Sequence, residues 1–312
     1  MKKVLFSIMV IVGLATQVSC TNESEDVRFS NSETLVEEAG MSAEDVELIK
    51  LQNEIADLNA RTFPEVPYTR GRGWWKWMRV FISDAVGGLF GNFFGGPIGA
   101  GVGAAACSAY AATNEVAISP EFDNSYKISM NSSETALNNV VPEPIKMANG
   151  VERITRSDSI GYFHNKVLLE ANKGDMLLQS RNARILTEKI CIAAKKTLFV
   201  DKEDVSIDEI MGNAQFGKFV EAKSTYLSAN QSIDNYCEEL GKLYPEQKLQ
   251  INVIGSFIDG VSRISVDEND GSYAEKVLDL VDNTNLSDDV KKQLRNGIIV
   301  GNASYQLWNL PN

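Results

Sequence analysis

Along most of this chain, apolar residues recur every three to four positions, which is the period of an amphipathic α-helix. In the C-terminal half this period predicts one helix that begins at residue 160. Further helices are predicted over 176–199, 207–243 with a break near 228–230, 249–264, 273–281 and 286–308. Nearer the start, residues 41–59 form another predicted helix, with Ser42 and Asp45 as its capping signal. The pattern therefore predicts a mainly α protein with a C-terminal bundle of about six helices.

The stretch from residue 85 to residue 114 departs from this pattern because it carries no charged residue. Glycine recurs in it at every fourth position: Gly87, Gly91, Gly95, Gly99 and Gly103. Residues four apart share a helix face, so the spacing predicts a glycine stripe on which a second helix packs closely. Gly88 lies about 100° away from that stripe, and alanine there is expected to cost little stability.

Pro97 interrupts the stretch, because proline inside a helix removes a hydrogen bond and clashes with the preceding turn. Two helices are predicted, 80–95 and 98–112, which together form a glycine-zipper hairpin. Each is about 24 Å long, shorter than the roughly 30 Å hydrocarbon core of a bilayer. A membrane hairpin, one kinked span and a hairpin buried in protein all remain open.

Three tryptophans precede the hairpin among four basic residues: Trp74, Trp75 and Trp77. Tryptophan is enriched at membrane interfaces, where basic residues meet anionic headgroups. A helix that buries the tryptophans in a protein core and leaves the bases in solvent explains the same residues.

The 312 residues carry a net charge of -12, and most of the acidic excess lies between 21 and 60. An acidic chain is a poor partner for nucleic acid, which needs a basic face. The chain is divided into a signal peptide (1–19), an acidic tether (20–40), an amphipathic helix (41–60), a cationic and glycine-zipper segment (61–114), a linker (115–151) and a helical domain (152–312) that is expected to fold alone.

Candidate catalytic and metal-binding residues are few. His164 is the only histidine, which removes two-histidine metal sites, and no G-x-S-x-G elbow accompanies it for a Ser-His-Asp set. A buried, hydrogen-bonded role is expected for this residue. Cys107, Cys191 and Cys237 form no Cys-x-x-Cys motif, and a Cys191–Cys237 disulfide stays open. The sequence predicts no cofactor, no metal and no enzymatic activity.

The first twenty residues have the order of an export signal: Lys2 and Lys3, an apolar run over 4–15, then small residues and Cys20. Gln17-Val18-Ser19-Cys20 resembles the lipobox of bacterial lipoproteins. That resemblance implies a lipid thioether on Cys20 and a fatty-acylated amine such as palmitate, hence a membrane as partner. The acidic residues over 21–26 resemble the surface-export mark of Bacteroidetes lipoproteins, which implies an outer-membrane, surface-exposed protein.

The segment 61–114 resembles two families. One is the glycine-zipper outer-membrane lipoproteins, and the other is the membrane-active core of class II bacteriocins. These resemblances imply a cell-envelope lipoprotein whose zipper segment is membrane-active or self-associating. The alternative is a non-enzymatic envelope module that binds another protein and keeps the zipper as a buried helical hairpin.

Overall fold

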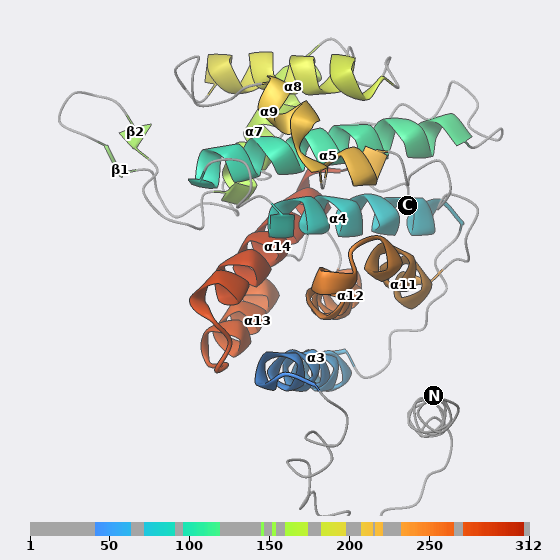
Figure 1. The fold of residues 1–312 in the computed structure, drawn as a ribbon, viewed down its shortest axis with the longest axis vertical. Helices are drawn as coiled ribbons and strands as arrows, with labels where there is room; N and C mark the ends of the chain where they lie inside the picture. Colours follow the sequence, from blue (N-terminus) through green and yellow to red (C-terminus); the bar gives the residue numbers. More distant parts are fainter. Residues whose placement is uncertain are drawn as a thin grey trace, which may run out of the picture. The chain divides into compact units, whose positions relative to one another are not determined.

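The computed structural model describes residues 41–63, 72–90, 96–118, 145–146, 152–153, 160–173, 182–197, 207–214, 216–220, 232–264 and 271–308. Almost all of these residues are helical (Figure 1), which confirms the mainly α class and the C-terminal helical bundle. The predicted signal peptide, the tether with Cys20 and most of the linker lie outside the described residues.

The larger helices of the N-terminal part are α3 (Ala43–Thr62), α4 (Arg72–Phe90) and α5 (Gly96–Ile118). They are followed by α7 (Ile160–Ala171), α8 (Ala183–Thr197), α9 (Ile207–Gly212), α11 (Ile233–Leu243), the 3-10 turn η4 (Pro245–Gln247), α12 (Lys248–Val261), α13 (Ser272–Asp282) and α14 (Asp288–Leu307). Two short strands, β1 (Ile145–Lys146) and β2 (Glu152–Arg153), pair antiparallel.

Most helix ends fall close to the positions that their capping residues predict. Ser42 and Asp45 form the predicted capping box at the start of α3, with both reciprocal hydrogen bonds present. Tyr244 caps the end of α11, and Pro245 opens the next turn. Pro97 is the second residue of α5, where its missing N–H costs nothing, so it helps to start that helix.

The α4–α5 hairpin forms the centre of the bundle (Figure 1). Between Trp77 and Phe90 every residue of α4 except Arg79 is buried, and so is every residue of α5 from 100 to 112. Helix α4 packs most extensively against α14 and α5, while α5 also contacts α7 and α8. A helix that is apolar on all sides needs cover on all sides, and these neighbours supply it.

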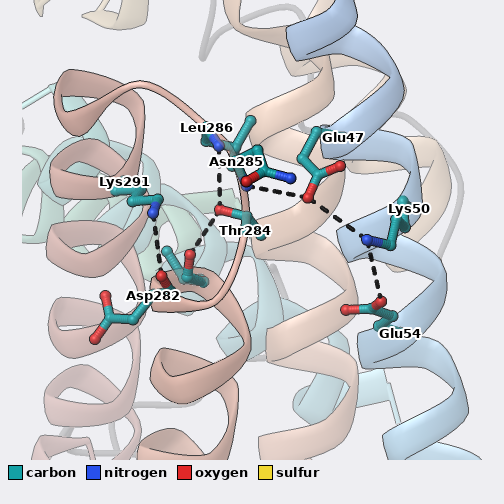
Figure 2. A network of polar contacts seen from close by, with 9 residues as sticks. Glu47, Lys50, Glu54, Asp282, Thr284, Asn285, Leu286 and Lys291 are labelled. Carbon is teal, nitrogen blue, oxygen red and sulfur yellow. Dashed lines mark hydrogen bonds and ion pairs between the residues drawn. The ribbon is translucent and has the colours of Figure 1, made fainter.

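Helix α3 packs on α12 and also holds the loop that joins α13 to α14 (Figure 2). The Glu47 carboxylate accepts a hydrogen bond from the backbone N–H of Asn285 at 3.1 Å. The Glu44 carboxylate accepts from both the backbone N–H and the hydroxyl of Ser287. Ser287 occupies the N-cap position of α14, but its hydroxyl donates to Glu44 and makes no capping bond to α14.

The C-terminal helices do not form a compact unit apart from the hairpin. Residues Ser42–Asn312 cluster as one compact unit, and one face of α14 packs against α4. A fragment limited to residues 152–312 would expose that face to water. Independent folding of residues 152–312 stays a prediction, which circular dichroism and thermal melting of that fragment would test.

Candidate functional site

The predicted glycine stripe is divided between two helices. Gly87 lies on α4, whereas Gly99 and Gly103 lie on α5; Gly91 and Gly95 fall outside the described residues. At Gly87 the two helices approach closely, because an added Cβ would lie 3.0 Å from the Cβ of Cys107. The stripe is thus no single continuous face, although close packing of α4 on α5 does occur where Gly87 predicts it.

The prediction for Gly88 is wrong. A Cβ at this position would lie 2.8 Å from the carbonyl oxygen of Asn296 and 2.9 Å from Cγ2 of Val300, both on α14. Alanine therefore cannot fit without a shift of backbone. On α14 the facing residues are glycines as well: a Cβ at Gly297 would lie 3.0 Å from the carbonyl oxygen of Ala85. Small residues on both helices allow α4 and α14 to approach backbone to backbone.

Of the three predicted interface tryptophans, Trp77 lies in the protein core. It is 7% exposed, and its ring lies 5.4 Å from that of Trp308 at the end of α14 and 6.4 Å from that of Phe81. Phe81 in turn meets Tyr305 edge to face. The side chains of Trp74 and Trp75 lie outside the described residues. For Trp77, the core interpretation of the tryptophan cluster applies.

A buried polar cluster lies at the centre of this apolar packing, around the carboxyl group of Asp84. Its oxygen Oδ2 accepts a hydrogen bond from the hydroxyl of Ser108 on α5, at 2.7 Å, and one from the hydroxyl of Ser304 on α14. The indole N–H of Trp308 donates to the same oxygen at 3.4 Å. Asp84 is completely buried, so these donors replace the water that a carboxyl group otherwise requires.

His164 on α7 completes the cluster and is also completely buried. Its Nδ1 lies 2.9 Å from Oδ1 of Asn165, whose Nδ2 donates to the carbonyl oxygen of Ala303. Because that carbonyl can only accept, the amide of Asn165 is fixed with its oxygen toward the imidazole, and Nδ1 carries a proton. The other nitrogen, Nε2, lies 3.8 Å from Oδ2 of Asp84. Helices α4, α5, α7 and α14 therefore all contribute to one cluster.

The cluster contains serine, histidine and aspartate, but it lacks the arrangement of a catalytic triad. Nucleophilic catalysis needs a serine hydroxyl that is hydrogen-bonded to the imidazole base. Here the hydroxyls of Ser108 and Ser304 donate to Asp84, and all these side chains have no exposed surface. The geometry is that of a polar network that fixes the relative positions of four helices.

We expect His164 to make the protein less stable in mild acid. Burial lowers the pKa of His164 to about 4, although the hydrogen bond to Asn165 opposes the shift. In the unfolded chain the pKa is close to 6.5, so the unfolded state binds the extra proton first as the pH falls. Between pH 6.5 and pH 4 the free energy of unfolding should therefore fall by about 3 kcal/mol through this group alone.

Chemical denaturation at pH 7.5, 5.5 and 4.5 would measure this effect, with His164→Gln as the matched variant. The difference in stability between wild type and variant should shrink or change sign as the pH falls. A difference that stays constant with pH would contradict the expected titration. Because glutamine does not titrate, the comparison removes the acid sensitivity that all other groups contribute.

The cysteines at positions 107, 191 and 237 are free thiols in the core. The disulfide between Cys191 and Cys237, left open by the sequence, is not formed. Burial raises the pKa of Cys191 to about 11 and that of Cys237 to about 12. Both groups are thus protonated at neutral pH and pack as small apolar residues.

A groove of about 590 Å³ lies between α3, α11 and α12. Its walls carry the Asp259–Arg263 ion pair, at 2.8 Å, together with Asp234 and the side chains of Gln52 and Asn59. Burial raises the pKa of Asp259, against the opposing effect of Arg263. Within the described part of the chain, no three histidine, cysteine or acidic residues come together as metal ligands.

Among the described helices, none combines the length and the hydropathy that crossing a bilayer requires. Comparison with known proteins adds no relative: no family model matches the chain, and no curated protein or solved structure gives a significant match.

The sequence failed to predict most members of this site. Ser108, Ser304 and Trp308 are ordinary residues in their local context, and only the fold brings them to Asp84. One signal was present: Asp84 is the only charge between Arg79 and Glu115. A lone carboxyl group in so long an apolar stretch must find buried donors, which makes it the position from which the cluster could have been sought.

Proposed function

We propose that this chain is a lipid-anchored protein of the bacterial cell envelope, held in the outer membrane and exposed at the surface. Its helical unit acts as a non-enzymatic module that binds another envelope protein, with the glycine-rich hairpin as its structural centre. The lipobox-like residues that end at Cys20 support the anchor. The burial of the hairpin on all described sides is the observation that carries the choice of an interaction module.

The packing of α4 favours a structural role over a membrane-active one. Its apolar side chains already contact protein on every side, so a bilayer offers them little further gain in burial. A move into lipid would also separate Asp84 from its donors on α5 and α14. An aspartate at the centre of a membrane helix costs about 2.5–3.5 kcal/mol even in favourable settings. The hairpin is therefore proposed to stay inside the folded unit.

The anchor is tested by the mass of the mature protein. We expect the wild-type chain to begin at Cys20 and to carry a diacylglyceryl thioether with an acylated amine, and to stay in the membrane fraction until detergent is added. Three acyl chains anchor a protein stably in a bilayer, whereas a single chain gives only marginal membrane binding. Cys191→Ala, which removes a different cysteine, is the matched control and should be lipidated normally. An unmodified Cys20 would refute the anchor.

The role of the hairpin is tested on a chain that begins at residue 21, without signal or lipid. We expect it to be a monomer in buffer without detergent and to release no dye from anionic liposomes. A requirement for detergent, or efficient dye release, would support the membrane-active alternative in place of the interaction module.

A further inference from the structure

Helix α8 presents an unusual outward face. Its inner face is buried against α5 and α7, and it lies at the edge of the described helices in Figure 1. On its outer face, Ile185 is 45% exposed and Ile192 is 59% exposed. Among the described residues the other exposed large hydrophobic side chain is Met41, just before α3. Two of these three side chains thus lie on one helix.

The same face of α8 is basic. Ile185 and Ile192 are seven residues apart, and Lys189 and Lys196 fall between and after them at helical spacing, so the four share one stripe. Arg184 and Lys195 flank that stripe. Three acids lie near these bases: Glu188 on α8 itself, Glu170 on α7, which pairs with Lys196, and Asp208 on α9, which pairs with Arg184 at 3.3 Å. In a chain with a net charge of -12, this helix carries a clear positive excess.

We propose that this α8 face docks on an anionic lipid surface. The two isoleucine side chains would enter the boundary between headgroups and acyl chains. The basic residues would exchange their exposed ion pairs for contacts with the phosphates. The inference goes beyond the proposed function, because it concerns the helical unit itself and not the residues around Cys20. It also assigns an orientation: α8 would face the membrane, and the groove between α3, α11 and α12 belongs to other helices.

Charge and area favour lipid over other occupants of the stripe. A second copy packed antiparallel on α8 would bring the lysines of the two stripes together, and like charges repel. A stable protein interface buries roughly 800 Å² on each partner, far more than two isoleucine side chains on one convex helix provide. A planar anionic surface needs only a few apolar side chains with basic neighbours.

A tether of sufficient reach would allow this contact. From Cys20 to the start of the compact unit at Ser42 there are about 22 residues, which span up to roughly 75 Å when fully extended. The experiment, however, is done without the lipid anchor, so its outcome is independent of whether Cys20 is modified.

The chain from residue 21 onward is mixed with vesicles of phosphatidylglycerol and phosphatidylcholine in equal parts, and with vesicles of phosphatidylcholine alone. We expect flotation with the anionic vesicles and loss of binding at 0.5 M salt. The double variant Ile185→Ser/Ile192→Ser should bind about tenfold more weakly or less. Met41→Ser is the matched control, since it removes the exposed side chain outside α8, and should bind like wild type.

Because both isoleucine side chains are exposed, the double variant should keep the wild-type melting temperature, which circular dichroism verifies. Wild-type protein that ignores anionic vesicles would overturn the proposal and leave an acidic protein as partner of this face. Equal binding of wild type and double variant, or equal binding to both kinds of vesicle, would overturn it too. Self-association that the double variant abolishes in the absence of lipid would assign the face to a second copy.

Discussion

Replacing Asp84 by alanine is expected to lower the free energy of unfolding by about 3–5 kcal/mol. The substitution leaves the hydroxyls of Ser108 and Ser304 and the indole N–H of Trp308 without their common acceptor. A serine hydroxyl in a helix can turn to a carbonyl oxygen in the preceding turn, but the indole N–H is fixed by its ring. The loss of stability should therefore remain large even after the neighbouring side chains have relaxed. Urea or guanidinium denaturation at pH 7.5 measures it.

Ser83→Ala is the matched control for this experiment. Ser83 is the neighbouring residue on α4, equally buried, and its hydroxyl makes one hydrogen bond of 2.8 Å with the hydroxyl of Tyr236. Loss of a single neutral hydrogen bond costs about 1 kcal/mol. If Asp84→Ala costs no more than Ser83→Ala, the cluster does not hold the four helices together.

Gly88→Val is expected to destabilise the protein by about 3 kcal/mol or more, at or above the upper end of ordinary overpacking. The new Cβ would meet the carbonyl oxygen of Asn296 at 2.8 Å, and backbone cannot turn away as a side chain can. The two additional methyl groups of valine would press on Val300 and force α14 away from α4. Thermal melting, followed by circular dichroism at 222 nm, reports the loss.

Gly217→Val is the control for this second prediction. Gly217 lies in the short helical stretch over 216–220, and a Cβ there meets nothing within 4 Å. The same substitution at an open helical site should change the free energy of unfolding by no more than about 0.5 kcal/mol. Equal melting temperatures for the two variants would show that α4 and α14 are not in backbone contact.

The sequence predicts the C-terminal helices of this protein well, because apolar and polar residues alternate along them at the helical period. Around α11, α12, α13 and α14, the apolar period and the capping residues place most ends within a few residues of the observed ones. The same reasoning could not decide whether the α4–α5 hairpin lies in a membrane or in the core of the protein. Its helices lack a polar face, and a uniformly apolar helix suits a membrane and a protein core equally well.

Most of the other wrong predictions arise because the sequence does not show which distant helices pack against each other. The glycine pattern at 87–103 indicates close packing but does not name the partner of each glycine. The prediction for Gly88 is wrong because its neighbour is α14, some two hundred residues further along the chain, where Gly297 and Gly301 face α4. Helix propensity alone predicts that alanine at Gly88 would stabilise α4. The contact with α14 instead requires a residue without a side chain at this position.

The contact between α4 and α14 can form only late in synthesis, because the two helices lie far apart in the chain. Helix α4 ends at Phe90, whereas its principal cover, α14, starts at Asp288. At 5–20 residues per second, a ribosome needs roughly 10–40 s to make the intervening stretch of about 200 residues. Throughout that interval the apolar surface of α4 lacks its last partner and is open to aggregation. A chain that stops before α14 would never acquire that cover, and we expect such a chain to aggregate.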